Sequence, residues 1–212
     1  MGNSLEFWEK LLPKQSFNNY LYTEETPLEQ NLYETIIRTS NIKPPRELFA
    51  IENSDLFTIE EMASSPAVLG LLDWLIKILA ARKILEIGTF AGVSTMYMAS
   101  AIAQDGKVTT LEKFDKFAKI ALRNFENNDL SDKIELILGD ALETIPLVEK
   151  NGPFDIIFID ADKENYATFF ELTTPFLAER GVVIIDDAIF HGDVLNSEPQ
   201  SEKGQGVKNM LE

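Results

Sequence analysis

The sequence predicts an α/β protein built on a parallel β-sheet, and two patterns support that fold class. Five short, nearly continuous apolar runs are of β type, at 83–87, 107–111, 134–138, 154–160 and 181–187. Segments with helical spacing of apolar residues separate these runs, at 93–103, 114–127, 141–150 and 165–177. Strands that are apolar on both sides are typical of a parallel sheet covered by helices on both faces. Ligands of such sheets bind beyond the carboxyl ends of the strands, so the residues that end each strand are the candidates for chemistry.

The part of the chain ahead of the first strand predicts additional helices. Residues 1–60 are expected to form a helical extension, and residues 61–212 the sheet domain. The aromatic side chains of the extension are interpreted as packing residues, with a substrate lid or a dimer contact as the alternative. Ser65 followed by Pro66 is a start signal for a helix, because serine is a good cap and proline suits the first turn. That helix leads directly into the first strand at Lys83.

Composition and charge exclude several classes of protein. The 212 residues include no cysteine, which rules out disulfides, zinc–thiolate sites and a thiol nucleophile. The net charge of −16 disfavours nucleic-acid binding, which depends on basic residues that neutralise phosphates. The sequence contains neither a secretory signal nor an apolar run long enough to span a membrane. We therefore expect a soluble cytoplasmic protein.

The loop after the first strand indicates the type of cofactor. Glu86 precedes a turn that contains Gly88 and Gly92, after which the spacing becomes helical. A dinucleotide-binding loop has glycine at its first, third and sixth positions, and here the third and sixth are Phe90 and Val93, which disfavours a nicotinamide dehydrogenase. A cofactor with an ammonium group and no phosphates suits the acid and the tight turn, and S-adenosylmethionine is such a cofactor. The alternative is an ordinary α/β turn that holds two glycines by chance.

The second and third strands also end in acidic residues. Glu112 ends the second strand, where α/β folds bind the ribose hydroxyls of a cofactor. The alternative is a solvated glutamate that begins the next loop. Asp140 follows the third strand and is interpreted as the cap of the next helix, with a place near an adenine ring as the alternative.

Three aspartates follow the fourth and fifth strands. Asp160 ends the fourth strand and Asp186 and Asp187 end the fifth, so neighbouring parallel strands would bring their carboxylates close together. Such anions repel one another unless a cation lies between them. Oxygen ligands without cysteine or a nearby histidine favour a hard ion, which would be Mg²⁺, Mn²⁺ or Ca²⁺. The alternative is that the acids spread into water and cap the following helices.

Lys163 is a candidate general base beside this group. It stands three residues after Asp160, and a neighbouring dication would lower the pKa of its ammonium group. An ordinary surface lysine is the alternative. His191, the single histidine, is interpreted as a loop residue and not as a base.

The strand-end motifs resemble those of a known family. The segments 85–89, 92–94 and 159–166, together with Asp186 and Asp187, are similar to the cation-dependent O-methyltransferases of the caffeoyl-CoA and catechol type. The similarity covers roughly residues 60 to 195, and its most specific part is Asp-Ala-Asp-Lys-Glu-Asn-Tyr. The resemblance implies a Rossmann-like S-adenosylmethionine-dependent methyltransferase fold and a homodimer.

The resemblance also implies a role for most strand-end residues. Lys163 and Asp160 would be catalytic, and Asp160, Asp186 and Asp187 would hold the divalent cation. The residues that would contact S-adenosylmethionine are Met62, Glu86, Gly88, Thr89, Ser94, Glu112, Ala141, Asp160 and Asp162.

The chain departs from the family pattern in three places. Asp187 stands where the family usually has asparagine, and Ala-Val-Leu at 67–69 replaces Glu-Gly-Gln. Relatives continue past the helix that is expected near Gly204 and add two closing strands. We therefore expect the final antiparallel strands to be missing and one edge of the sheet to be uncovered.

Together these features predict a divalent-cation-dependent methyl transfer from S-adenosylmethionine to one hydroxyl of a vicinal diol. The substrate would be a hydroxylated aromatic small molecule such as a catechol. A tRNA methyltransferase acting on a hydroxylated uridine is one alternative, which the net charge of −16 disfavours. A module that binds S-adenosylmethionine without turnover is the other.

Overall fold

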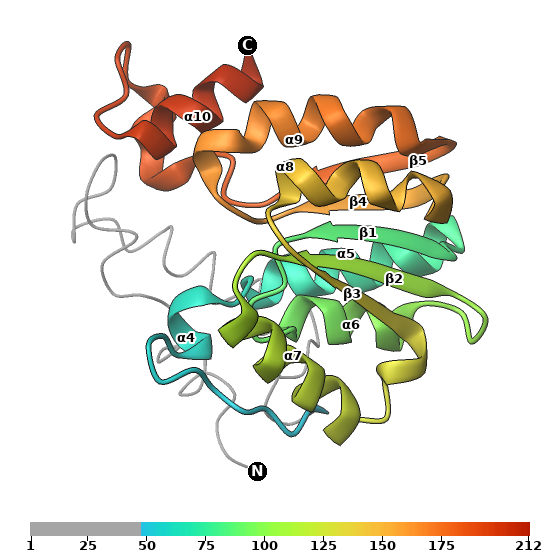
Figure 1. Cartoon of the computed structure of the whole chain (residues 1–212). Helices are drawn as coiled ribbons and strands as arrows, with labels where there is room; N and C mark the ends of the chain where they lie inside the picture. The colour runs from blue at the N-terminus through green and yellow to red at the C-terminus, as the bar shows by residue number, and fades with distance from the viewer. Residues whose placement is uncertain (1–47) are drawn as a thin grey trace.

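A five-stranded parallel sheet lies between two layers of helices (Figure 1). The computed structural model describes residues 48–212, except for the side chains at 60 and 61, so most of the expected N-terminal extension lies outside the described residues. The strands are β1 (Lys83–Ile87), β2 (Lys107–Glu112), β3 (Ile134–Leu138), β4 (Phe154–Ile159) and β5 (Leu177–Ile185). Their order is β3-β2-β1-β4-β5, and every neighbouring pair is parallel, as the sequence predicts.

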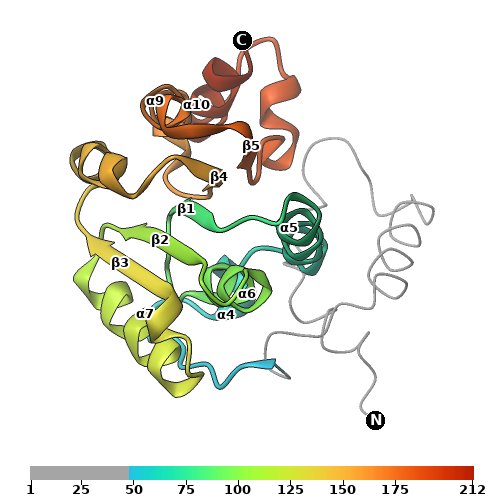
Figure 2. The same cartoon turned by 90° about the vertical axis from the view of Figure 1, so that its right-hand side faces the viewer.

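Helices cover both faces of this sheet (Figure 2). They are α4 (Ile59–Met62), α5 (Pro66–Leu79), α6 (Val93–Ala101), α7 (Asp115–Asn127), α8 (Ala141–Thr144), α9 (Tyr166–Thr173) and α10 (Glu202–Leu211). Short 3₁₀ turns complete the connections, namely η1 (Ser131–Lys133), η2 (Ile145–Asn151), η3 (Lys163–Asn165), η4 (Thr174–Phe176) and η5 (Phe190–Leu195).

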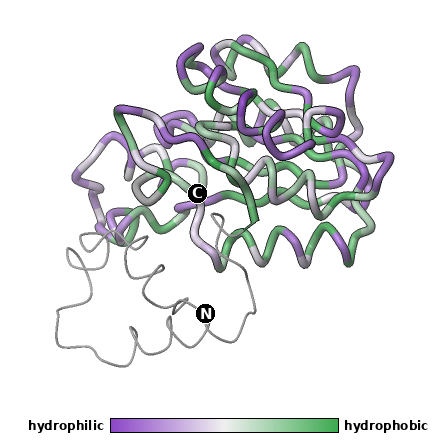
Figure 3. The backbone as a smooth tube through the Cα atoms, turned by 90° about the horizontal axis from the view of Figure 1, so that it is seen from below, coloured by the Kyte–Doolittle hydropathy of each residue, from purple (hydrophilic) through white to green (hydrophobic). Residues whose placement is uncertain are grey.

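The core consists of two apolar layers, one on each side of the sheet. Leu72 of α5, Met96 of α6 and Phe125 of α7 pack in the first layer. Phe169 of α9 and Val207 of α10 pack in the second. Figure 3 shows hydrophobic and hydrophilic stretches alternating along the backbone, with hydrophilic residues at several outer turns. This two-sided burial explains why the strands read as continuous apolar runs.

Most element boundaries follow from local signals in the sequence. The Ser65 side chain accepts a hydrogen bond from the Val68 N–H at 3.3 Å, and Pro66 begins α5, which confirms the predicted helix start. Helix α10 begins two residues before the expected position at Gly204, because the Ser201 side chain caps it. Strand β5 begins at Leu177, where a helix was expected to end.

Two predicted helices are shorter than the sequence periodicity indicates, and proline explains both. The expected helix 141–150 is α-helical only to Thr144 and continues as the 3₁₀ turn η2, which contains Pro146. The expected helix 165–177 changes in the same way after Thr173, at η4, which contains Pro175. Proline has no N–H to donate, and its ring clashes with the carbonyl four residues earlier, so an α-helix cannot continue through it.

Strand β5 lies at the edge of the described sheet, with β4 as its partner. All strand pairs in the part of the chain that the structure describes are parallel. Within residues 48–212, no helix combines the length and the hydropathy needed to cross a membrane.

Candidate functional site

The carboxyl ends of β1 and β4 come into close contact through the loop after β1. Gly88 adopts a φ of +101°, and a Cβ built on it would overlap the carbonyl oxygen of Asp160 and lie 2.8 Å from its carbonyl carbon. The Asp160 N–H also donates to the Ile87 carbonyl at 2.9 Å. Only glycine combines this dihedral angle with so close an approach. The loop therefore lies directly beside the first of the three aspartates.

Glu86 is fully buried beneath this loop and accepts hydrogen bonds from three hydroxyl groups. Ser94 Oγ donates to one carboxylate oxygen at 2.5 Å, and Thr110 Oγ1 donates to the other at 2.6 Å. Thr95 Oγ1 donates to that second oxygen as well. Burial nonetheless raises the pKa of Glu86 to about 7, because the hydroxyl groups only partly compensate for the lost hydration. Glu86 therefore organises the base of the loop.

Glu86 is expected to make folding stability depend on pH. In the folded protein its carboxyl group keeps a proton up to a pH of about 7, whereas in the unfolded chain it loses that proton near 4.5. Its contribution to the free energy of unfolding is therefore fully present below pH 4.5 and is lost as the pH rises through about 7. Between pH 4.5 and about 7 this titration should lower the free energy of unfolding by on the order of 3 kcal/mol, and replacing Glu86 with glutamine should remove that fall.

Urea unfolding at a series of pH values measures this effect. Glu86→Gln should flatten the fall in stability between acidic and neutral pH, and the exposed Glu126→Gln should leave that fall unchanged. Some pH dependence remains in the Glu86 variant, because Asp160 titrates in the same direction. If the wild type and Glu86→Gln show the same pH dependence, the pKa of Glu86 is not raised by folding.

Glu112 joins the end of β2 to the loop after β1. One carboxylate oxygen accepts from the Phe90 N–H at 2.8 Å and the other from the Phe114 N–H at 2.9 Å. Burial raises the pKa of Glu112, and these backbone donors offset part of the rise. The backbone N–H groups of Thr89 and Lys113 also stabilise the charged form, so four backbone donors surround this carboxylate.

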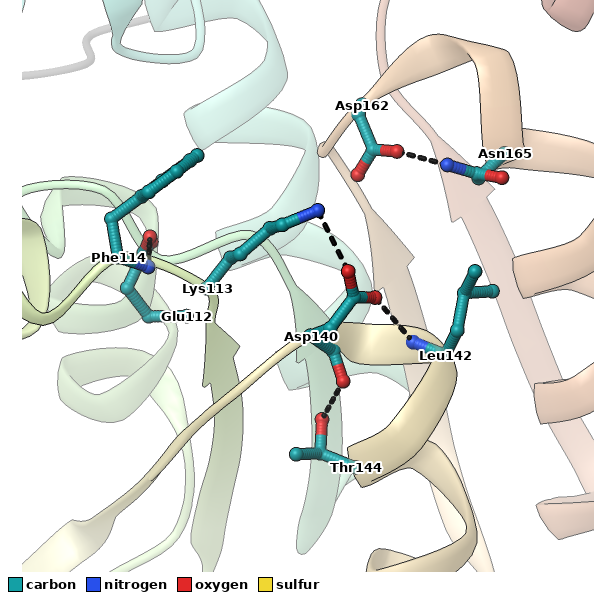
Figure 4. A network of polar contacts seen from close by, with 8 residues as sticks. All are labelled: Glu112, Lys113, Phe114, Asp140, Leu142, Thr144, Asp162 and Asn165. Atoms are coloured by element: carbon teal, nitrogen blue, oxygen red, sulfur yellow. Dashed lines mark hydrogen bonds and ion pairs between the residues drawn. The ribbon is translucent and has the colours of Figure 1, made fainter.

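A polar network spans the ends of β2, β3 and β4 (Figure 4). Lys113 Nζ lies 2.7 Å from Asp140 Oδ2. The other oxygen of Asp140 accepts from the Leu142 N–H at 3.0 Å, which confirms the predicted helix cap and places Ala141 at the start of α8. After the end of β4, Asn165 donates to the Asp162 carboxylate. The ion pair holds the pKa of Asp140 below its usual value, so its carboxylate is charged.

The three aspartates and Lys163 lie together at the ends of β4 and β5. Lys163 Nζ is 3.1 Å from Asp187 Oδ2 and 3.8 Å from Asp160 Oδ1. Burial raises the pKa of Asp160 to about 7, and the negative charges of Asp186 and Asp187 add to the rise, which Lys163 partly offsets. Burial and the charge of Asp187 also raise the pKa of Asp186. One ammonium group therefore does not compensate for three carboxylates.

This imbalance bears on whether a metal ion fits. Oxygen donors with a surplus of negative charge match the preference of Mg²⁺, Mn²⁺ and Ca²⁺. Among residues 48–212, however, no three acidic, histidine or cysteine side chains are arranged as a group that could hold an ion. The nearby positive charge is instead the ammonium of Lys163. The chemistry of the donor set fits a hard cation, and the role of the aspartates as its ligands stays a prediction.

Other residues singled out in the sequence lie near this edge of the sheet. Thr89 is buried, and its hydroxyl group lies 2.5 Å from that of Thr110. Met62 ends α4 with an exposed side chain. His191 occupies the turn η5 after β5 and is exposed, in agreement with its interpretation as a loop residue.

The structure adds two residues to which no role was given from the sequence. Ser64 Oγ donates to Asp160 Oδ2 at 3.3 Å, although the two residues are far apart in sequence. Lys163 Nζ donates to the buried Tyr166 Oη at 3.2 Å. The spacing of three residues in a helical turn was an available signal for this second pair, since it places both side chains on one side.

Comparison with known proteins identifies similar chains. A family model described as O-methyltransferase matches residues 47–212. The catechol O-methyltransferase of Mycobacterium tuberculosis is 34% identical over 163 residues, which cover 77% of this chain and 73% of that protein.

Two similar solved structures contain a ligand. The O-methyltransferase TomG of Streptomyces achromogenes, in complex with S-adenosylmethionine, is 30% identical with a TM-score of 0.68, over 71% of this chain and 69% of that one. The O-methyltransferase of Bacillus cereus, in complex with S-adenosylhomocysteine, is 30% identical with a TM-score of 0.66, over 98% of this chain and 86% of that one.

Proposed function

Because the chain belongs to the O-methyltransferase family, we propose that it transfers the methyl group of S-adenosylmethionine to one hydroxyl of a vicinal diol, on a catechol-like small molecule, with a divalent cation bound. The observation that carries this proposal is the cluster of Asp160, Asp186, Asp187 and Lys163 at the carboxyl ends of β4 and β5. Catechol O-methyltransferases among the relatives support the choice of substrate class.

The cofactor would bind along the edge formed by β1, β2 and β3. Glu112 would accept hydrogen bonds from the ribose hydroxyls, since it ends the second strand, where α/β folds bind them. Gly88, Thr89, Ser94 and Glu86 would line the methionine end. We extend the same proposal to Met62, Ala141, Asp162 and Asp160. Relatives solved with S-adenosylmethionine or S-adenosylhomocysteine support this choice of cofactor.

The cation would be held by Asp160, Asp186 and Asp187. When bound, S-adenosylmethionine supplies the methyl group, and a divalent cation supplies positive charge that favours ionisation of the acceptor hydroxyl. Lys163 would act as the neutral amine once a cation is bound beside it, and its Nζ, which lies next to Tyr166 and Asp187, would then accept the proton that the hydroxyl loses. The three aspartates, of which Asp187 is exposed, and the loop at Gly88 would orient the acceptor. Such alignment contributes on the order of 7–11 kcal/mol in well-oriented systems.

Removing the metal ion is expected to abolish turnover. Methylation of a simple catechol should fall to background in EDTA and return when excess Mg²⁺ is added, because the aspartates then regain a cation. EDTA saturated beforehand with Mg²⁺ is the control for effects of the chelator itself. Full turnover in free EDTA would reject the metal role while leaving methyl transfer in place.

The remaining parts of the proposal concern the whole chain. We propose that residues 61–212 carry the methyltransferase site, that residues 1–60 form a lid or dimer contact, and that the protein acts as a homodimer in the cytoplasm. Sedimentation measures the oligomeric state directly. Incubation with bulk tRNA in place of catechol tests the alternative substrate, which the charge of −16 disfavours.

A further inference from the structure

We infer that helix α10 positions Lys163, and that Gly206 is the residue through which it does so. The inference rests on the proposed role of Lys163 in methyl transfer and assigns a function to a helix outside the site described above. Helix α10 lies beside α9, across the turn η3 that carries Lys163 (Figure 1).

Gly206 contacts the backbone of the lysine turn directly. A Cβ built on Gly206 would overlap the carbonyl oxygen of Lys163 and lie 2.5 Å from Cα and 3.0 Å from the carbonyl carbon of Glu164. These are backbone atoms, so no side chain can turn away to make room. Any residue larger than glycine at this position must therefore displace either α10 or the turn η3.

Helix α10 is held firmly at its N-terminus, which makes displacement of the turn an expected outcome. The buried carboxylate of Asp193 accepts from the Gln200 N–H at 2.8 Å and from Ser201 Oγ at 2.7 Å. Ser201 Oγ in turn accepts from the Gly204 N–H at 3.0 Å. A Cβ on Gly204 would lie 2.6 Å from Asp193 Cγ, so this contact is also close. These hydrogen bonds keep the pKa of Asp193 below its usual value, and the carboxylate stays charged.

Val207, the next residue of α10, packs in the apolar layer that contains the tyrosine bonded to Lys163. Val207 is fully buried in the same apolar layer as Tyr166. The Tyr166 hydroxyl accepts from Lys163 Nζ at 3.2 Å. Helix α10 thus contacts the backbone of the Lys163 turn through Gly206 and shares, through Val207, the apolar layer that contains Tyr166. The Lys163 side chain is 12% exposed.

Gly206→Ala tests the inference by separating kcat from KM. We expect kcat for catechol methylation to fall by about tenfold to a hundredfold, since displacements near 1 Å have effects of that size. The KM for S-adenosylmethionine should change less than kcat, because most of the proposed cofactor residues lie at the ends of β1 and β2 and not beside η3. Gln205→Ala is the matched control, since Gln205 is exposed on the same helix and its side chain donates to Asn209 of that helix.

A double-mutant cycle distinguishes positioning from general damage. In a Lys163→Ala background, Gly206→Ala should cause no further loss of kcat, because the group that it displaces is gone. An equal loss in both backgrounds overturns the inference. If Lys163→Ala is slow and Gly206→Ala is as fast as the wild type, the inference fails and the proposed function stands. If Lys163→Ala retains the full rate, the proposed role of the lysine fails as well.

Chemical labelling provides a readout that does not depend on turnover. Acylation of Lys163 by an N-hydroxysuccinimide ester, measured by peptide mass spectrometry, should rise about twofold or more in Gly206→Ala as local protection is lost. Lys77 and Lys119, whose side chains are 63% and 70% exposed, serve as internal references. Unchanged labelling of Lys163 contradicts the inference.

Ser201→Ala serves if Gly206→Ala does not fold. This substitution removes the α10 cap and one hydrogen bond to Asp193 without introducing a clash. Loss of a cap costs about 1 kcal/mol, so the protein should remain folded. A smaller loss of kcat that disappears in the Lys163→Ala background supports the inference, and a loss that persists there overturns it.

Discussion

Lys163→Ala is expected to lower kcat by about a hundredfold to ten-thousandfold, the usual contribution of a positioned general base. Its Nζ lies 3.1 Å from Asp187 and 3.2 Å from the Tyr166 hydroxyl, so the proton-accepting atom is fixed in place. The variant also loses the one positive charge that lowers the pKa of Asp160. The KM for S-adenosylmethionine should change little. An unchanged kcat removes the lysine from the mechanism.

Lys163→Arg separates the two effects of this residue. Arginine keeps the positive charge beside the aspartates, yet it cannot act as a base because its guanidinium group does not lose its proton in proteins. If Lys163 accepts a proton, Lys163→Arg should be as slow as Lys163→Ala. If the residue serves only to balance charge, the arginine variant should keep most of the activity. Lys77→Ala is the control, because Lys77 also pairs with an aspartate, at 2.7 Å, but on the surface of α5.

The sheet was predictable from sequence because its burial is regular. The central strands are buried on both faces, so their apolar runs show where they begin and end, and β1 (Lys83–Ile87) matches the predicted run 83–87. The edge strand β5 (Leu177–Ile185) is less buried and begins four residues before the predicted run 181–187. The helices were less predictable where a local rule interrupts the period. Pro146 and Pro175 end α-helices that the apolar spacing alone would continue.

The candidate site was predictable only in part. Strand ends in a parallel sheet meet at one edge, so the positions of Asp160, Asp186 and Asp187 followed from topology. Contacts between distant segments did not follow. Ser64 donates a hydrogen bond to Asp160, which lies 96 positions later in the chain, and no local sequence pattern predicts that bond. The contact between α10 and the Lys163 turn is likewise a tertiary contact that no local sequence pattern predicts.

The position of Glu86 shows why residue type alone does not give a residue's surroundings. The sequence indicated an acid suited to a ligand's ammonium group. The structure places its carboxylate among the hydroxyl groups of Ser94, Thr95 and Thr110, two of which lie on α6 and one on β2. Its proposed contact with the cofactor therefore has to pass through, or reorganise, this hydroxyl network.

Gly88→Ala is expected to have the largest effect on stability. The added Cβ would overlap the Asp160 carbonyl oxygen, and alanine would also have to adopt a φ of +101°. Because Asp160 directly follows β4 and its N–H donates to the Ile87 carbonyl, its backbone cannot move without disturbing the end of the sheet. The free energy of unfolding should therefore fall by about 3–5 kcal/mol, at the upper end for single substitutions. Urea unfolding measures this fall, and calorimetry with S-adenosylmethionine should detect weaker binding, since the same loop lines the proposed cofactor edge.

Gly139→Ala is the matched control for this effect. Gly139 also has a positive φ, +147°, but its added Cβ would meet only the methyl group of Thr144, at 2.7 Å. A side-chain methyl group can turn away, so the cost should be that of the dihedral strain, about 1–3 kcal/mol. The difference between the two variants therefore measures the clash between the loop after β1 and the end of β4. If both variants lose the same amount of stability, the loop after β1 can move away from Asp160. The fold then does not require the close contact between the proposed cofactor loop and the proposed metal site.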